Sequence, residues 1–197
     1  MIKPQLWVFA GPNGAGKSTL TDRYVGDRLS IINPDVVALT LDPASRGQAV
    51  ALRAGRIVLQ QQEDFLAQHK NFGRETTLTG NDVPKLMRRA SGAGYKVNLV
   101  YVGLDDVKLS LRRVATRVAD GGHDIARDDI LRRYDRSMAN LMQIIPLVDR
   151  VYVFDNSERR RRLVFSREDG RTKFVSKNLP VWAEKAIPAS LRMSSHR

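Results

Sequence analysis

The residues best suited to chemistry form one glycine-rich stretch near the start of the sequence. It fits the pattern G-x-x-x-x-G-K-[ST] from Gly11 to Ser18 and follows the apolar run from Leu6 to Ala10. A buried strand, a glycine-rich loop and a helix that opens at Lys17 or Ser18 are the context in which this pattern binds phosphate. The residues expected to contact a nucleotide are Gly11, Pro12, Asn13, Gly14, Ala15, Gly16, Lys17, Ser18 and Thr19.

The physics of phosphate binding accounts for these residue types. Glycines adopt backbone conformations closed to residues with a Cβ, so consecutive N–H groups can turn inward around a phosphate. The positive end of the following helix adds to that field. Lys17 would bring its ammonium group to the β- and γ-phosphates of ATP, and Ser18 would offer a hydroxyl to Mg²⁺. ATP and Mg²⁺ are therefore the expected phosphoryl donor and metal.

A carboxylate follows the second expected strand. Residues 30–33 form a short apolar strand that Pro34 ends, and Asp35 lies in the turn after it. Ligands of open α/β sheets bind beyond the carboxyl ends of the strands, where Asp35 could accept a proton from an acceptor hydroxyl. The alternative is that Asp35 only caps the helix or turn that follows.

A second carboxylate closes the strand expected at about residues 71–76. Glu75 stands where P-loop enzymes place an acidic residue that supports the metal. Thr76, Thr77 and Thr79 could hydrogen-bond the acceptor or a phosphate, or they could be ordinary strand and turn residues.

Arginines gather on two helices expected at about residues 105–120 and 128–145. The glycine-rich break at 121–125 joins these helices, which gives them the shape of a lid that closes over phosphates and excludes water. The alternative is that several of the arginines are solvated or ion-paired with Asp124, Asp128 and Asp129. His123 in the break has no second His or Cys nearby and is a poor metal ligand. The arginines are Arg112, Arg113, Arg117, Arg132, Arg133 and Arg136.

The remaining pattern predicts how these parts are positioned. Apolar spacing predicts a long helix at about 43–69, a helix at 82–91 and buried strands at 96–103 and 150–156. Asp169-Gly170 predicts a β-hairpin, and a terminal helix follows at 180–193. We therefore expect an α/β fold of the P-loop kinase class, a three-layer sandwich around a mainly parallel five-stranded sheet. Residues 1–197 would form a single domain, with its core at about 5–156 and the hairpin and C-terminal helix at about 157–193.

Composition limits the partners. The chain has 33 Lys and Arg against 21 Asp and Glu, an excess that favours nucleic acid, nucleotides or an acidic protein. No nucleic-acid motif accompanies this charge, so nucleic acid is not expected as the main partner. No apolar run approaches the roughly 20 residues that span a bilayer. Cysteine is absent, which excludes disulfides and thiol catalysis, and Met1 to Pro4 leads directly into the first strand without a signal peptide, so we expect a cytoplasmic protein.

The order of four motifs resembles the zeta-toxin family of P-loop kinases, the toxins of bacterial epsilon/zeta-type toxin and antitoxin systems. The resemblance covers about residues 5–156, and the sequence departs from the family pattern where Ala126 replaces an expected proline. The motifs are Gly-Pro-Asn-Gly-Ala-Gly-Lys-Ser-Thr at 11–19, Asn33-Pro34-Asp35, Glu75-Thr76-Thr77-Leu78 and the arginine-rich lid from Arg113 to Leu141.

The resemblance implies an ATP·Mg²⁺-dependent kinase that phosphorylates a hydroxyl of a small molecule, such as the UDP-amino sugar UDP-N-acetylglucosamine. By this likeness Lys17 would hold the ATP phosphates, Ser18 the Mg²⁺, and Asp35 would act as general base. Glu75 and Thr77 would contact the acceptor or support the metal, and lid arginines Arg117 and Arg133 would stabilise the transferring phosphoryl group.

An acidic antitoxin would suit the basic charge of the chain. Two other functions share the loop and lid. One is a P-loop NTPase switch that binds nucleic acid through its arginines, and the other is a nucleotide or nucleoside kinase.

Overall fold

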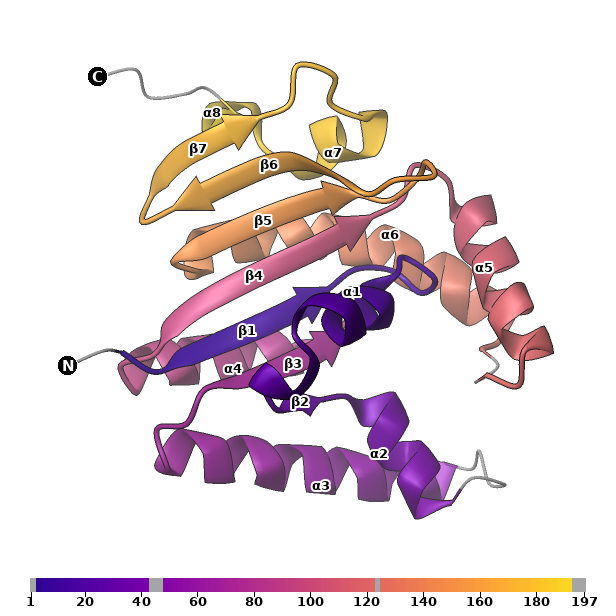
Figure 1. Ribbon diagram of the computed structural model, residues 1–197, viewed down its shortest axis with the longest axis vertical. Coiled ribbons are helices and arrows are strands. Elements are labelled where there is room, and N and C mark those ends of the chain that lie inside the picture. The colour runs from indigo at the N-terminus through magenta and orange to yellow at the C-terminus, as the bar shows by residue number, and fades with distance from the viewer. Residues whose placement is uncertain (1–2, 43–47, 123–124, 193–197) are drawn as a thin grey trace.

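One sheet runs through the whole molecule. The computed structural model describes residues 3–42, 48–122 and 125–192, and its seven strands lie in the order β2-β3-β1-β4-β5-β6-β7 (Figure 1). The strands are β1 (Gln5–Ala10), β2 (Ile31–Ile32), β3 (Phe72–Thr76), β4 (Lys96–Gly103), β5 (Arg150–Asp155), β6 (Arg162–Glu168) and β7 (Arg171–Val175).

The first five strands are parallel to one another, whereas β6 runs antiparallel to both β5 and β7. Helical crossovers link the parallel strands, as such connections require. The turn between β6 and β7 places both Asp169 and Gly170 at positive φ, which confirms the expected hairpin. The expected mainly parallel α/β sheet is confirmed, but the hairpin is not separate from it: β6 pairs with β5, so the sheet has seven strands instead of five.

Helices connect and cover the strands. Among the described residues, none of them combines the length and apolar character that crossing a membrane requires. They are α1 (Lys17–Tyr24), η1 (Gly26–Arg28), α2 (Pro34–Leu41), α3 (Gln48–Ala67), α4 (Asp82–Gly92), α5 (Val107–Ala119), α6 (Arg127–Ile144), η2 (Ile145–Leu147), α7 (Val181–Ala186) and α8 (Ala189–Arg192).

Three helix boundaries differ from the sequence expectation. Pro34 does not lead into a turn but opens α2, because the Asn33 side chain accepts a hydrogen bond from the Asp35 N–H at 2.9 Å and proline fits the first helical turn. Asp106, and not Asp105, caps α5 by accepting from the Lys108 N–H. The expected terminal helix is two short helices separated at Pro188, which cannot continue a helix interior.

The core lies mainly on one face of the sheet. Leu6, Val8 and Ala10 of β1 point into a large apolar cluster that includes residues of α4, α6 and α7, and all three are fully buried. The alternate residues Trp7 and Phe9 point into a smaller cluster that Leu20 of α1 joins. In Figure 1, α1 lies in front of β1, while α4 and α6 lie behind the strands. The sandwich is therefore thicker on one side than on the other.

The last helices close the carboxyl end of the core. Trp182 of α7 is buried, and its indole N–H donates to the Asp155 carboxylate at 3.1 Å. The ring lies over Gly103 so closely that a Cβ there would come within 2.2 Å of it. Helix α7 is thus fastened to the ends of β4 and β5.

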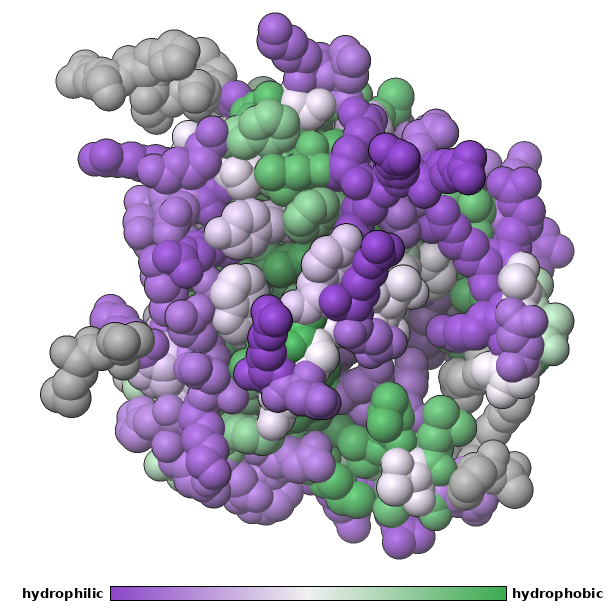
Figure 2. Space-filling view, viewed as in Figure 1, coloured by the Kyte–Doolittle hydropathy of each residue, from purple (hydrophilic) through white to green (hydrophobic). Residues whose placement is uncertain are grey.

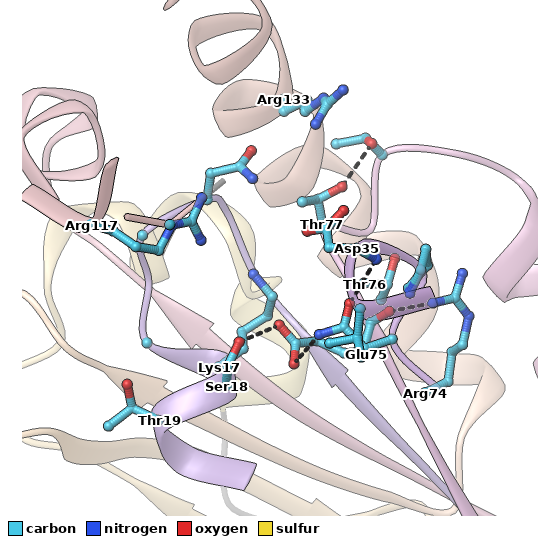
Figure 3. Close-up of a pocket in the computed structure, with 18 of the residues that line it drawn as sticks. Lys17, Ser18, Thr19, Asp35, Arg74, Glu75, Thr76, Thr77, Arg117 and Arg133 are labelled. Atoms are coloured by element: carbon cyan, nitrogen blue, oxygen red, sulfur yellow. Dashed lines mark hydrogen bonds between the residues drawn. The ribbon is translucent and has the colours of Figure 1, made fainter. Parts of the chain in front are cut away.

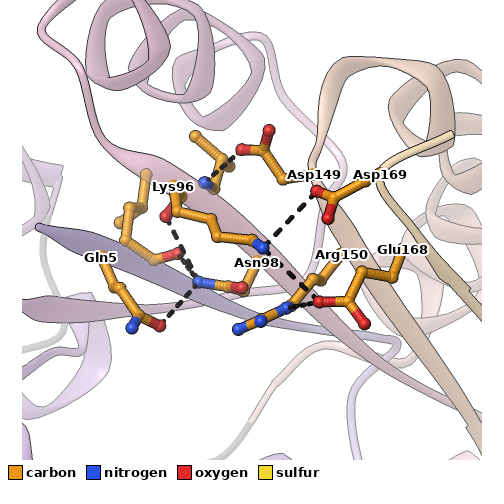
Figure 4. A network of polar contacts seen from close by, with 9 residues as sticks. Gln5, Lys96, Asn98, Asp149, Arg150, Glu168 and Asp169 are labelled. Carbon is orange, nitrogen blue, oxygen red and sulfur yellow. Dashed lines mark hydrogen bonds and ion pairs between the residues drawn. The ribbon is translucent and has the colours of Figure 1, made fainter. Parts of the chain in front are cut away.

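The amino end of the sheet is held by a polar network (Figure 4). Lys96 lies 3.5 Å from both the Glu168 and the Asp169 carboxylates, and the Arg150 guanidinium also pairs with Glu168. The Asp149 carboxylate accepts from the Val97 N–H at 2.7 Å. Cations and carboxylates are matched here, and the contacts tie β4, β5 and β6 together.

Candidate active site

A cavity of about 910 Å³ opens at the carboxyl ends of the parallel strands (Figure 3). It brings together predicted residues from four separate parts of the sequence. Of the phosphate loop, Gly11, Pro12 and Ala15 do not line the cavity. The predicted residues that line it are Asn13, Gly14, Gly16, Lys17, Ser18, Thr19, Asp35, Glu75, Thr76, Thr77, Arg117 and Arg133.

Glycine is required at three points of the loop. Gly14 and Gly16 have φ of 70° and 91°, in the left-handed region. A Cβ on Gly11 would come within 2.1 Å of the Val102 carbonyl oxygen. Helix α1 begins at Lys17, directly after Gly16, so its N-terminus faces the cavity. This arrangement offers backbone N–H groups and a positive helix end to an anion.

Lys17 is a buried cation on the loop. Its Nζ donates to the carbonyl oxygens of Gly11 and Pro12 at 2.9 and 3.1 Å. Burial lowers the pKa of Lys17, and the nearby carboxylates of Glu75 and Asp35 oppose that shift. A bound phosphate would supply the buried ammonium group with a further negative charge.

The carboxylate of Glu75 joins three elements. It accepts from the Ser18 hydroxyl at 2.9 Å through Oε1 and from the Asn33 side-chain amide at 3.1 Å through Oε2. Asn33 in turn accepts from the Asp35 N–H, so one chain of hydrogen bonds runs from α1 through β3 to the start of α2. Through it Asn33 fixes the beginning of α2, the helix that bears Asp35.

Ser18 and Glu75 also provide oxygen atoms suited to Mg²⁺. Magnesium prefers one or two protein oxygens, with waters and substrate phosphates completing its shell. The described residues contain no group of three or more His, Cys, Asp or Glu that could hold a metal alone. The hydroxyl and carboxylate at this point therefore fit the metal of a phosphate substrate.

Three side chains from distant segments brace the phosphate loop. The Ser110 hydroxyl donates to the Asn13 carbonyl, and the Asn156 amide donates to the Ala15 carbonyl at 2.8 Å. The Arg113 guanidinium reaches the Gly14 carbonyl at 3.5 Å. Sequence analysis missed Ser110 and Asn156, because no local pattern marks them, and it placed Arg113 on the lid when its side chain contacts the loop.

The lid helices supply the other side of the cavity. Arg117 of α5 and Arg133 of α6 border the same space as Lys17 (Figure 3). Arg132 and Arg133 both pair with Asp129, at 2.6 and 3.2 Å, as the ion-pair alternative foresaw. The Gly122 N–H donates to the Arg117 carbonyl at 2.8 Å, while His123 and Asp124 lie outside the described residues.

Arg74 is a cavity residue that sequence analysis missed. It is only 4% exposed, donates to the Glu75 carbonyl and lies 3.4 Å from the Asp82 carboxylate. Burial lowers its pKa despite that carboxylate. The signal was available: Arg74 is a charged residue in the middle of a buried strand, a place where charge is rare.

The threonines after Glu75 divide into two kinds. The Thr76 hydroxyl accepts from the Leu78 N–H at 2.9 Å, which stabilises a turn in which Leu78 has a positive φ of 59°. The hydroxyls of Thr77 and Thr79 share a hydrogen bond of 3.1 Å on the cavity wall. Thr76 thus has the turn role that we considered, and all three threonines line the cavity.

Comparison with known proteins identifies the family of this chain. The model of the zeta toxin family matches residues 1–176. The chain belongs to the zeta toxin family. A Haemophilus influenzae protein described as uncharacterised is 34% identical over 141 residues, which cover 68% of this chain and 100% of that protein. The expected zeta toxin assignment is confirmed, and the family supports the expectation of a kinase.

Solved structures share the fold of this zeta toxin family member. A chain of the AvrRxo1-ORF1:AvrRxo1-ORF2 complex with sulphate ions has a TM-score of 0.76 and 16% identity, and the match covers 95% of this chain. It covers 65% of that chain, so the present protein spans less than two thirds of its length.

Two further matches concern an ATP complex and a toxin. The AvrRxo1 complex with ATP matches at a TM-score of 0.72 and 16% identity, over 87% of this chain and 60% of that one. A structure of the PezAT toxin-antitoxin system of Streptococcus pneumoniae matches at a TM-score of 0.63 and 19% identity. The match covers 84% of this chain and 72% of that one. At such identities these likenesses show the P-loop kinase fold alone.

Proposed function

We propose that this chain transfers the γ-phosphoryl group of ATP to a hydroxyl of a small molecule, and that the acceptor is a UDP-amino sugar such as UDP-N-acetylglucosamine. One observation carries the proposal: the phosphate loop, the Ser18–Glu75 pair, Asp35 and the lid arginines all border one cavity. The ATP in a structural neighbour supports the same donor for this fold.

Each residue then has a chemical role. Lys17 and the loop N–H groups bind the phosphates of ATP, and Ser18 and Glu75 would hold Mg²⁺, which would neutralise phosphate charge. Asp35 accepts the proton of the acceptor hydroxyl. The hydroxyl oxygen bonds to the γ-phosphorus, and the bond from that phosphorus to the ADP oxygen breaks. Arg117 and Arg133 stabilise the charge that develops on the transferring group.

The acceptor side of the cavity supports a substrate that carries its own phosphates. Arg74, Arg132 and Arg136 line the cavity in addition to the residues assigned to ATP. Val36 and Leu39 of α2 add an apolar wall against which a base or sugar ring can pack. A volume of about 910 Å³ is at the upper end of ordinary ligand pockets and leaves room for two substrates.

The basic charge supports an acidic partner that restrains the enzyme in the cytoplasm. The net charge of +12 favours association with an acidic protein. Structural neighbours come from two-protein complexes, the PezAT toxin-antitoxin system and AvrRxo1-ORF1 with AvrRxo1-ORF2. We propose an antitoxin as the partner of this chain.

An acceptor screen by mass spectrometry tests the function. Purified protein, Mg²⁺ and ATP are incubated with UDP-N-acetylglucosamine, other UDP-sugars, nucleosides and nucleoside monophosphates. We expect UDP-N-acetylglucosamine to gain one phosphate. A mass gain only on nucleosides or their monophosphates would favour a nucleotide kinase, and ATP consumption without any mass gain would favour an NTPase.

Asp35→Asn separates binding from transfer in the same assay. The amide cannot take the proton, so we expect transfer to fall by about 10²- to 10⁴-fold. The dissociation constant for ATP, measured by calorimetry, should stay close to that of the parent. Unchanged turnover would remove Asp35 from the role of base.

A further inference from the structure

Arg74 carries a positive charge into the apolar side of the sheet. On β3 it pairs in register with Val8 of β1 and Ile32 of β2, and both of these side chains belong to the large apolar cluster. Register partners on parallel strands point to the same face of a sheet. Replacing a buried ion pair by apolar residues often leaves stability unchanged or raises it. Stability therefore does not explain an arginine at this position.

The Arg74 guanidinium connects the ends of three elements. Its Nη1 donates to the Glu75 carbonyl of β3 and lies 3.5 Å from the Ile32 carbonyl of β2, while Nη2 lies 3.4 Å from the Asp82 carboxylate of α4. Arg74 lines the phosphate cavity, and in the view of Figure 3 it lies on the side of Glu75 away from Lys17. The planar guanidinium thus fixes these three ends relative to one another.

Helix α2, which bears Asp35, has little support from packing. All of its residues are described and none of them is buried, and Val36 and Leu39 are 55% and 44% exposed. Figure 2 shows hydrophobic side chains, in green, at the surface where α2 lies. Polar contacts hold the start of the helix instead, because the Asn33 side chain accepts from the Asp35 N–H and donates to the Glu75 carboxylate. The position of Asp35 therefore depends on the chain around Asn33.

Arg74 contacts the residues on which Asn33 depends. Ile32 precedes Asn33 in the chain, and its carbonyl faces the Arg74 guanidinium. Glu75 receives the closer contact from Arg74 on its main chain and holds the Asn33 amide with its side chain. Burial lowers the pKa of Arg74, and nearby carboxylates, that of Asp35 among them, oppose the shift. Asp35 is therefore within the electrostatic reach of this guanidinium.

We propose that Arg74 is a positioning residue, which holds the corner between β2 and α2 so that the Asp35 carboxylate reaches the acceptor hydroxyl. The proposal rests on the proposed function, in which Asp35 is the base. Without the guanidinium, only the contacts of Asn33 would hold this corner. A displacement of about 1 Å can slow an enzyme reaction by about 10²-fold, so a small shift of the corner is enough to affect transfer.

Two other roles suit Arg74 less well. A contact with a substrate phosphate would need free N–H groups on the cavity side, but Arg74 is only 4% exposed and both Nη atoms already contact carbonyl or carboxylate oxygens. Its Nε has no hydrogen-bond partner among the described residues, yet this atom is itself buried. A purely structural role would suit an apolar side chain equally well, as the neighbours Val8 and Ile32 show.

The kinetics of Arg74→Met test the proposal, with ATP and the acceptor found in the screen. Methionine fills much of the space but cannot donate to the carbonyl groups, so we expect kcat to fall by about tenfold. The acceptor KM and the dissociation constant for ATP should stay within about twofold of the parent, because Ser110, Arg113 and Asn156 brace the phosphate loop without Arg74. Arg88→Met, an exposed change on α4, is the matched control and should leave kcat unchanged.

Two further variants separate positioning from a general loss of structure. Arg74→Lys keeps a donor on a long stem, so we expect it to recover part of the lost kcat. Asp82 orients the guanidinium, so Asp82→Asn should lower kcat by less than Arg74→Met does, and the double variant should be no slower than Arg74→Met alone. The melting temperature of Arg74→Met should stay close to that of the parent, since an apolar side chain replaces a buried charge.

Hydrogen exchange followed by mass spectrometry tests the link without any acceptor. We expect the amides of residues 31–41 to exchange faster in Arg74→Met than in the parent, because the start of α2 is less firmly held. The amides of residues 11–24, in the phosphate loop and α1, should exchange as in the parent. Equal exchange of residues 31–41 in the two proteins would contradict the link between Arg74 and α2.

The outcomes separate this proposal from the kinase proposal. If the parent phosphorylates no acceptor, the proposed function fails, and the positioning role fails with it. With an active parent, equal kcat values for Arg74→Met and Arg88→Met would overturn the positioning role and leave the kinase proposal standing. A raised acceptor KM with unchanged kcat would overturn it in favour of a direct contact with the acceptor. A lower melting temperature with unchanged kcat would overturn it in favour of a structural role.

Discussion

The two ends of the sheet use charge in opposite ways. At the amino end, Lys96 and Arg150 meet Glu168 and Asp169, so cations and carboxylates are matched (Figure 4). At the carboxyl end, the lining of the phosphate cavity contains one lysine and six arginines but only three carboxylates. Matched charges leave little net charge for a ligand, whereas a net positive lining attracts a ligand of opposite sign even where some of its arginines are ion-paired. The comparison separates residues that link the strands at one end of the sheet from the residues to which we assign the chemistry at the other.

The largest expected effect is at the carboxyl end. Lys17→Ala removes the buried ammonium group from the loop, and we expect kcat/KM to fall by about 10³-fold, or roughly 4 kcal/mol of transition-state stabilisation. The melting temperature should change little, because the variant removes the cost of a buried charge but also removes the donor to the Gly11 and Pro12 carbonyl groups. Lys85→Ala, an exposed change on α4, is the matched control. Parent-like turnover of Lys17→Ala would contradict the assignment of the loop.

The lid should show the next effect. Arg117→Ala and Arg133→Ala each remove a guanidinium from the cavity, and we expect kcat to fall by about 10²-fold in each. Arg112→Ala, an exposed neighbour on the same helix as Arg117, should change kcat little. Steady-state kinetics with ATP and the acceptor found in the screen gives the comparison. If all three variants behaved alike, the lid arginines would have no special place in transfer.

The amino end should respond in stability and not in activity. Asp149→Ala leaves the Val97 N–H without its 2.7 Å partner, so we expect the free energy of unfolding to fall by about 1–2 kcal/mol. Urea denaturation measures that loss, and kcat/KM under native conditions should stay within about twofold of the parent. A large loss of activity in the folded variant would contradict the expectation that the amino end of the sheet affects stability alone.

The smallest expected effect is a shift in the pH dependence of kcat/KM. Burial lowers the pKa of Lys17 from its ordinary value of 10.5. The charged form that binds phosphate is present below this lowered pKa and is lost as the pH rises through it, so kcat/KM should fall at a pH below 10.5. The Glu75 carboxylate raises the pKa of Lys17, so Glu75→Gln should move that alkaline limb to lower pH. Glu158→Gln is the control, and a limb that moves upward in Glu75→Gln would contradict the coupling.

Local signals made much of the fold and of the phosphate site predictable. The glycine spacing and the Lys17-Ser18 pair belong to one short stretch, and the strands β4 and β5 contain apolar runs. The helix at Pro34–Leu41 was missed although its signal was present, since Asn33 followed by proline is a helix start as well as a strand end.

Contacts between segments that are distant in the sequence could not be predicted. Ser110 and Asn156 contact carbonyl groups 97 and 141 residues away in the sequence, and neither has a neighbour pattern that marks it. The pairing of β6 with β5 is likewise invisible in the hairpin sequence, because the Asp169-Gly170 turn specifies only how β6 meets β7. The direction in which an arginine of α5 or α6 points depends on where that helix begins and ends. Helix boundaries are hard to predict to the exact residue.

The position of Trp182 has a consequence for the order in which a newly made chain acquires its site. Synthesis delivers the N-terminal segments first, so Lys17 and Ser18 leave the ribosome long before α7. A nascent chain that has reached Asn156 contains the whole phosphate loop but lacks the indole that covers Gly103 and donates to Asp155. The carboxyl end of the sheet is therefore completed last, and an unfinished chain holds the residues of a phosphate site without the support that fixes them.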